Sequence, residues 1–257
     1  ISTYSEGMNG SCSPKDLETM LQLVHLYFTA PRADQEAFTS NMERTKAMLK
    51  NMELNPMITL SDSLNKVLYN NHPLTVRMKA EDYDKVDYAK AMEMYKDRFA
   101  DPNNFTFVFV GNIDVKTFRP LVEQYLASLK KSKRSENWKN IGLAVNDDNY
   151  VTHYRKEMQD PKTSVYMIYN GDMEYNLYND TYMDVLSDVL DIVYTKSIRE
   201  EQGGTYGVGV MGSINNRPEN DFRFLIAFDT NDEVYATLMD IAKAGLKAIA
   251  ANGPRQE

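Results

Sequence analysis

The chain contains 257 residues, which is enough for one large domain or for two domains of ordinary size. Hydrophobic residues make up 42% and charged residues 26%, a composition typical of soluble globular proteins. The formal net charge of −8 argues against nucleic acid or an anionic membrane surface as the main partner, because both attract clustered Lys and Arg. The longest apolar runs have the length of a strand, so no membrane segment is predicted.

Cysteine usage and the two ends of the chain constrain its context. Cys12 is the single cysteine, which excludes an internal disulfide and a zinc site built from thiolates and leaves the redox compartment undecided. The chain starts at Ile1 without an initiator Met or a signal sequence, and it stops just after a helix-ending Gly253-Pro254. We therefore expect this sequence to be a piece of a longer protein, whose compartment the sequence leaves open.

The first half of the chain has mainly helical periodicity. The clearest strand pattern is Phe105–Val110, where aromatic and β-branched residues follow one another, and residues 1–10 resemble the end of another strand. Apolar residues at helical spacing, with capping residues at the starts, predict five helices. These helices run from Ser13 to Phe28, from Asp34 to Met52, from Pro56 to Tyr69, from an Asp84 cap to Phe99, and from an Asp114 cap to Leu129.

The second half begins after a polar stretch without periodicity, which predicts a linker over residues 131–149. Further on, the patterns predict the strands Tyr150–Met158, Thr163–Tyr169, Tyr206–Ser213 and Phe222–Thr230 and the helices Asn179–Glu201 and Asp232–Ala251. We therefore expect an α+β protein with two tandem partial domains, residues 1–130 and 150–257. Each would hold a mixed, largely antiparallel sheet with helices packed on one face.

A helix, a tight turn and a strand follow one another in the most distinctive stretch of the chain. The Gly203-Gly204 pair predicts a helix cap followed by a turn. Such a turn places Arg199 and Tyr206 on either side of it, where a guanidinium and a phenol can reach the same oxygen atom. We predict a polar substrate clamp made of Arg199 and Tyr206, with Gly203, Gly204 and Thr205 contributing to substrate binding.

This glycine-rich turn does not fit a phosphate-binding loop. The glycines follow a helix instead of preceding one, so no helix N-terminus faces a phosphate, and no Lys-Ser or Lys-Thr pair follows them. A purely structural alternative stays open: the glycines cap the helix, Arg199 pairs with Glu200 or Glu201, and Tyr206 packs in the sheet.

The histidines do not form a recognisable metal motif. His25, His72 and His153 lie on a predicted helix, a loop and a strand, and none has the spacing H-E-x-x-H or H-x-x-E-H. The motif G-x-S-x-G is also absent, and no His is marked as a partner for Cys12. The sequence therefore predicts neither a metal site nor a catalytic nucleophile in this chain.

The stretch Arg-Glu-x-x-Gly-Gly-Thr-Tyr-Gly-Val resembles the segment R-x-x-x-G-x-x-Y-x-V of the pitrilysin and insulin-degrading-enzyme family of zinc metallopeptidases, the inverzincins. Further segments are similar in the same order: the helix from Asp16 to Arg32, the loop Asn71-His72-Pro73-Leu74, and the region from Tyr83 to Leu129. The similarity covers nearly the whole chain. The family's H-x-x-E-H helix and third metal ligand are absent from it.

This resemblance implies a metallohydrolase-like, LuxS-type two-layer sandwich and the C-terminal half of a zinc endopeptidase. Residues 1–130 would be a partial third domain without its N-terminal strands and metal-motif helix, and residues 150–257 the front of a fourth domain. In the family, the Arg and Tyr of this motif contact the substrate carbonyl at the scissile bond, so the resemblance assigns that role to Arg199 and Tyr206. It also implies that zinc, its ligands and the general base belong to the N-terminal half, which would be a partner together with a peptide substrate.

On this reading the isolated chain holds no cofactor and is inactive. The alternative is a catalytically inactive homologue that serves as a scaffold or a partner subunit. Presence of both Arg199 and Tyr206 favours the enzyme, because a scaffold has no evident need for that pair. The sequence leaves open which peptide is cleaved and whether the chain forms a homodimer through open strand edges.

Overall fold

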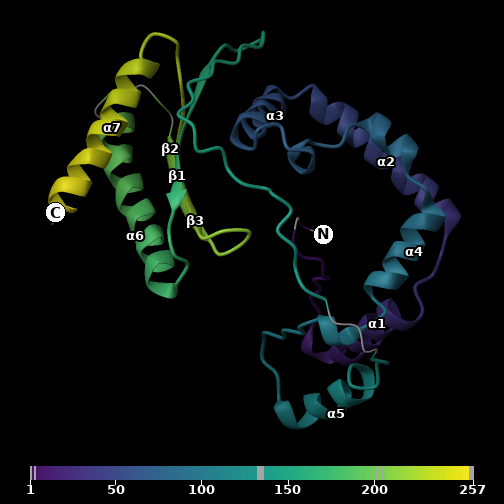
Figure 1. Cartoon of the computed structure of the whole chain (residues 1–257). Coiled ribbons are helices and arrows are strands. Elements are labelled where there is room, and N and C mark those ends of the chain that lie inside the picture. The colour runs from purple at the N-terminus through teal and green to yellow at the C-terminus, as the bar shows by residue number, and fades with distance from the viewer. Residues whose placement is uncertain are drawn as a thin grey trace. The chain divides into compact units, whose positions relative to one another are not determined.

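The computed structural model of the chain describes residues 2, 4–131, 136–200, 202, 203, 205 and 207–254 (Figure 1). The chain forms two compact units, which are considered separately below. The first unit contains Ile1–Asn55 and Arg77–Lys139, and the second contains Pro56–Val76 and Asn140–Glu257. All residues from Asn140 onward belong to the second unit, so this boundary lies inside the predicted linker. No helix in the described ranges is both long and apolar enough to cross a membrane.

The first unit is built from helices whose starts are marked by aspartates. Its helices are α1 (Leu17–Thr29), α2 (Gln35–Glu53), α4 (Tyr88–Arg98) and α5 (Val115–Tyr125). Asp34 accepts a hydrogen bond from the Ala37 N–H at the start of α2, and Asp114 accepts one from the Lys116 N–H at the start of α5. These carboxylates accept hydrogen bonds from N–H groups that have no partner inside the helix.

The predicted cap of α4 at Asp84 is wrong. Asp87 caps this helix, and its carboxylate accepts a hydrogen bond from the Lys90 N–H. Asp84 instead lies within the short 3₁₀ helix Ala80–Lys85, and its carboxylate pairs with Lys46. Both aspartates precede helical residues in the sequence, so the choice between them depends on the extended backbone at Asp87, which the pattern does not reveal.

The segment Phe105–Val110 is extended, but the predicted strand is not formed. Its side chains alternate: Phe107 and Phe109 pack on the core that α1 and α5 share, while Val108 and Val110 are 76% and 93% exposed. No neighbouring strand pairs with it among the described residues. The predicted strands at residues 1–10 and 150–158 are likewise not formed in the described part of the chain. Period-two alternation shows which side is buried, but a strand also needs a hydrogen-bonded neighbour.

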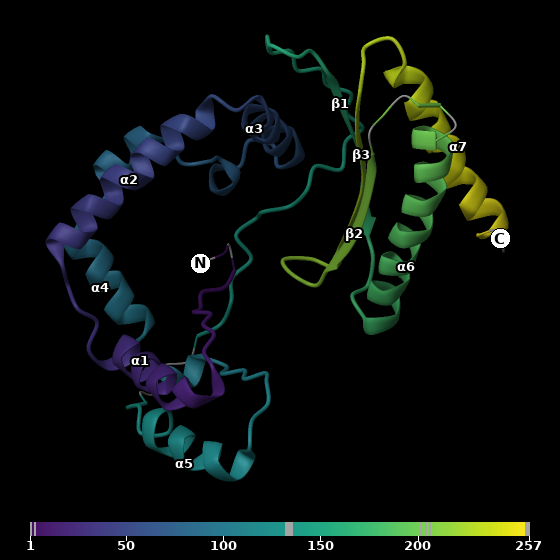
Figure 2. The ribbon, with the colours of Figure 1, turned by 180° about the vertical axis from the view of Figure 1, so that it is seen from behind.

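The second unit holds a three-stranded antiparallel sheet with two helices on one face (Figures 1 and 2). The strands β1 (Thr163–Asp172), β2 (Val208–Asn215) and β3 (Asp221–Thr230) lie in the order β1-β3-β2. Helices α6 (Leu177–Tyr194) and α7 (Tyr235–Asn252) cover the sheet, and α3 (Pro56–Leu68) also belongs to this unit. The predicted α+β class is therefore confirmed, and the antiparallel sheet with helices on one face is found in this unit.

The core of the second unit lies between this sheet and its helices. Phe228 is central, because it pairs with Val165 of β1 on one side and with Val208 of β2 on the other. All three side chains are buried, whereas the opposite face of β2 is open, with Met211 63% exposed. Helices contribute Leu190, Tyr194, Leu238 and Ala242 to the same core. Removing this apolar surface from water is the main driving force for the unit.

Helix α6 approaches β2 closely because Gly212 has no side chain. A Cβ atom at Gly212 would lie 2.4 Å from Met183 Cγ and 2.9 Å from Ser187 Oγ, both on α6. Separations this short are repulsive, so any larger residue would push the helix away from the strand. Gly209, on the other face of the same strand, has no atom within 4 Å of an added Cβ.

We predict that Gly212→Ala lowers the free energy of unfolding by about 1–3 kcal/mol, because the added methyl overpacks the contact between α6 and β2. Gly209→Ala is the matched control on the same strand, and it should leave the stability unchanged or raise it slightly. Urea unfolding followed by circular dichroism measures both values. Equal stabilities for the two variants would contradict the close approach of α6 at Gly212.

Candidate functional site

The site predicted from sequence lies where α6 ends. The α-helical part stops at Tyr194 and continues as a π-helical segment, Thr195–Glu200, instead of running as a regular α-helix to Glu201 as expected. Such segments are rare and are frequently found at functional sites. Ile198 is fully buried within it, and Arg199, the next residue, is exposed. The segment therefore turns Arg199 toward solvent while its neighbour stays in the core.

Two buried side chains fix this helix end. Ile198 and Tyr194 both have 0% exposure and belong to the core of the second unit. The Tyr194 hydroxyl donates a hydrogen bond of 2.7 Å to the carbonyl oxygen of Ala242 on α7. Burial raises the pKa of Tyr194 to about 12, so the phenol keeps the proton that it donates. The position of Arg199 is therefore tied to the packing of α6 on α7.

Arg199 has a side chain that is free to bind a ligand. The Arg199 side chain makes no hydrogen bond or ion pair with any residue in the described part of the chain, and the neighbouring Glu200 does not pair with it. Pairing with Glu201, the other structural alternative, lies outside the described residues. A guanidinium offers five N–H donors in a planar fork, which suits the oxygen atoms of a peptide backbone or a carboxylate.

The turn after Arg199 has the form predicted from its glycines, as far as it is described. Gly203 has φ of +60°, and its N–H donates a hydrogen bond of 3.1 Å to the Arg199 carbonyl oxygen. This is the left-handed position that commonly ends helices and that glycine adopts without strain. Thr205 Oγ1 donates to the Gly207 carbonyl oxygen at 2.9 Å, which tightens the chain before β2.

Gly204 and Tyr206, the other predicted site residues, lie outside the described residues. The approach of Tyr206 to Arg199 therefore stays a prediction. The structure does place β2 two residues after Tyr206, at Val208, so the order of helix, turn and strand is the predicted one.

The histidines are used locally and do not come together. His25 Nδ1 lies 2.7 Å from the Tyr125 carbonyl oxygen, and His72 Nδ1 accepts a hydrogen bond from the Leu74 N–H. His153 is exposed. Within the described ranges, no three residues of the types His, Cys, Asp and Glu lie close enough together to hold a metal ion. The donor set of these residues does not fit a zinc site, which needs three or four converging ligands.

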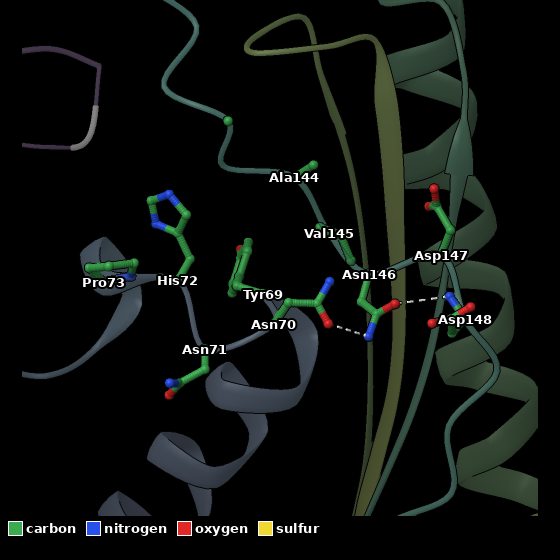
Figure 3. Close-up of a pocket in the computed structure, with 11 residues that line it drawn as sticks. Tyr69, Asn70, Asn71, His72, Pro73, Ala144, Val145, Asn146, Asp147 and Asp148 are labelled. Carbon is green, nitrogen blue, oxygen red and sulfur yellow. Dashed lines mark hydrogen bonds between the residues drawn. The ribbon is translucent and has the colours of Figure 1, made fainter.

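A second candidate is a cavity of about 570 Å³ within the second unit, between the loop after α3 and residues 142–148 (Figure 3). Asn70 and Asn71 stand in the left-handed conformation at the bend of this loop, with φ of 49° and 57°. Asn146 Nδ2 donates to Asn70 Oδ1 at 2.9 Å, and Asn146 Oδ1 accepts from the Asp148 N–H at 3.0 Å. The amide of Asn146 is thus occupied in holding the two segments together.

The arrangement around this cavity offers little for catalysis. The His72 ring lies across the cavity from Asp147 and Asp148 (Figure 3), so no acid and base approach one another. We therefore regard the cavity as a consequence of how residues 142–148 attach to the end of α3, and the exposed Arg199 as the better candidate site.

Sequence reasoning missed the structure that supports Arg199. Neither the π-helical segment nor the hydrogen bond from Tyr194 to Ala242 was anticipated. A signal was present, because α7 carries small residues at Ala242 and Gly245, where the Tyr194 ring packs. A Cβ at Gly245 would lie 2.7 Å from Tyr194 Cε1, so this position is open only to glycine.

Comparison with known proteins adds independent information. A family model described as "Peptidase M16 inactive domain" matches residues 85–257. A "Zinc protease PQQL-like" protein of Arabidopsis thaliana is 27% identical over 94% of this chain and 27% of its own length. The "Probable zinc protease PqqL" of Escherichia coli is 23% identical over 98% of this chain and 27% of its own length. The chain thus spans about a quarter of the length of these relatives.

Solved structures agree with this fold. The crystal structure of the periplasmic protease PqqL from Escherichia coli superposes with a TM-score of 0.78 at 22% identity, over 94% of this chain and 26% of that one. A peptidase M16 inactive domain from Pseudomonas fluorescens superposes with a TM-score of 0.72 at 18% identity, over 95% of this chain and 58% of that one. Since the family model matches well over half of its residues, the chain belongs to the peptidase M16 inactive-domain family, a part of the pitrilysin-type zinc proteases.

Proposed function

We propose that this chain is the non-metal-binding C-terminal half of a zinc-dependent endopeptidase. In this proposal Arg199 and Tyr206 contact the backbone of a peptide substrate in an active site whose zinc is held by the protein's N-terminal half. The observation that carries the proposal is the exposed Arg199, which has no partner in the described part of the chain and stands at a helix end fixed by Tyr194 and Ile198. Family membership supplies the context of a zinc protease.

The role of Arg199 follows from the chemistry of peptide hydrolysis. The carbonyl oxygen of the scissile bond gains negative charge in the transition state, and donors aimed at it lower the barrier. Removing one such donor typically reduces kcat by about 10²–10³. The planar fork of Arg199 can bind the substrate backbone through two N–H groups, and the Tyr206 hydroxyl would add a third donor.

Rigid support is what makes such donors effective. A donor stabilises the transition state most when it is already in place before the reaction. Burial of Ile198 next to Arg199, and the hydrogen bond of Gly203 to the Arg199 carbonyl oxygen, restrict the backbone on both sides of the guanidinium. In the proposal, this chain binds and orients the substrate, and the metal chemistry takes place in the other half.

The rival proposal is an inactive homologue that acts as a scaffold or a partner subunit. Of the two structural partners considered for Arg199, Glu200 does not pair with it and Glu201 lies outside the described residues, so the described part of the chain leaves the guanidinium available for a ligand. The Escherichia coli relative is described as periplasmic, and we propose the same compartment for this protein.

The proposed division of the active site predicts how much zinc the isolated chain holds. Metal analysis of the purified 257-residue chain should find well below one zinc per chain, and the chain alone should cleave no unfolded peptide substrate. The described residues offer no converging ligands that would hold the metal. The intact protein, analysed in parallel, should retain zinc. One tightly held zinc per isolated chain would contradict the proposed division of the site.

The next prediction concerns the clamp. In the intact protein, Arg199→Ala should lower kcat/KM for peptide cleavage by about 10²–10³, and Tyr206→Phe should lower it in the same direction without unfolding the domain. Arg119→Ala is the matched control, because Arg119 is an exposed arginine of α5 that pairs with Glu123 on its own helix, in the first unit. Its loss should leave kcat/KM unchanged. Unchanged turnover in both clamp variants would leave Arg199 and Tyr206 with a structural role only, and absence of any peptide cleavage by the intact protein would favour the scaffold.

Another prediction concerns the turn between Arg199 and Tyr206. Gly203→Ala should lower the free energy of unfolding by about 1–2 kcal/mol, because an L-residue with a Cβ is strained at a φ of +60°. The same change should reduce kcat/KM in the intact protein, since it displaces the backbone next to Arg199. Gly207→Ala is the control, because an added Cβ meets no atom there within 4 Å. If the two variants behave alike, the turn does not position the clamp.

A further inference from the structure

Helix α6 carries a second apolar face, on the side opposite to the core. We call this face the outer stripe, and it consists of Tyr178, Tyr182, Val185, Val189 and Ile192. Tyr178 and Tyr182 are 77% and 68% exposed, and Val185 and Ile192 are 52% and 71% exposed. A single exposed apolar residue is ordinary in a folded protein, but a continuous row along four turns of one helix is not.

The outer stripe has the geometry of a helix-packing seam. Its residues follow one another at intervals of four, three, four and three, the spacing of a coiled-coil seam. Met183, Leu190 and Tyr194 on the inner side of the same helix are buried in the core that this helix shares with the sheet and α7. A helix that is apolar on two opposite sides is normally packed between two neighbours. The second neighbour is not found among the described residues.

A row of carboxylates runs beside the outer stripe. It consists of Asp184, Asp188 and Asp191, at intervals of four and three residues; Asp188 lies next to the stripe, and the other two lie further round the same side of the helix. None of these side chains makes a hydrogen bond or an ion pair with a residue in the described part of the chain. Like charges at this spacing repel one another, so the row costs stability unless an oppositely charged partner approaches it.

The negative charge beside the outer stripe determines which kind of helix can pack on it. If two copies of the chain packed their outer stripes together in an antiparallel pair, Asp188 of each copy would lie on the same side of the interface, because the same flanking positions meet in that arrangement. Such a contact would be repulsive. A helix with Lys and Arg beside its apolar seam would place positive charge against the row and lower its repulsion.

We propose that the outer stripe of α6 is a docking site for a basic amphipathic helix of a partner polypeptide. The partner's apolar seam would pack on Tyr182, Val185 and Ile192, and its Lys or Arg residues would pair with Asp184 and Asp188. This site lies on the solvent side of α6 and does not depend on the role of Arg199, so each proposal can fail without the other.

The test uses two designed helical peptides as probes, each of 21 residues with the same leucine seam. One peptide has Lys beside the seam and the other has Glu, and both are used at concentrations at which they are monomeric. Calorimetric titration into the full chain should show binding of the Lys peptide and at least about tenfold weaker binding of the Glu peptide. Equal binding of the two peptides, or no binding of either, would overturn the proposal.

Variants of the chain locate the contact. Ile192→Lys should weaken binding of the Lys peptide by at least about tenfold. Val110→Lys, the same gain of charge at an exposed residue of the first unit, should leave the affinity for this peptide unchanged. The double change of Asp184→Lys and Asp188→Lys should reverse the preference, so that the Glu peptide binds better. Sedimentation of the chain alone tests the other occupant: a dimer that Ile192→Lys abolishes would assign the stripe to a second copy and overturn the proposal.

Discussion

The close packing of α6 on the sheet and on α7 is the constraint on which the rest of the second unit depends. Gly212 lets α6 approach β2. At the C-terminal end of α6, the Tyr194 hydroxyl donates a hydrogen bond to the carbonyl oxygen of Ala242 on α7. These contacts set both the height of α6 above the sheet and the point at which its regular part ends. The exposed guanidinium of Arg199 and the turn at Gly203 follow from that end point.

Helix α6 therefore has three parts with different chemistry. Its inner side completes the core, its C-terminal end presents Arg199, and its outer side carries an apolar row flanked by aspartates. Because the same rigid element carries all three, a partner that binds the outer side would contact the helix that positions Arg199.

Sequence patterns predicted the helices and the three strands of the second unit well, because most of these elements bury one apolar face within their own unit. The extended segment Phe105–Val110 shows where this reasoning ends: its alternation describes burial on one side, but pairing depends on a neighbour that no local pattern specifies. The choice of Asp87 over Asp84 as a helix cap likewise depends on backbone angles at one residue. At the candidate site, the end of the helix near Arg199 and the left-handed Gly203 were predictable from the glycines. The π-helical segment was not, because it results from tertiary packing of Tyr194 and Ile198.

The burial of Tyr194, whose hydroxyl bonds to Ala242, also determines how the helix end responds to pH. Burial raises the pKa of this phenol from 10 to about 12, so the folded state favours the protonated form. The stabilisation from this shift is fully present below pH 10 and is lost only as the pH rises from 10 to about 12. The Tyr194 anchor of the helix end next to Arg199 is therefore unaffected by changes of pH around neutrality.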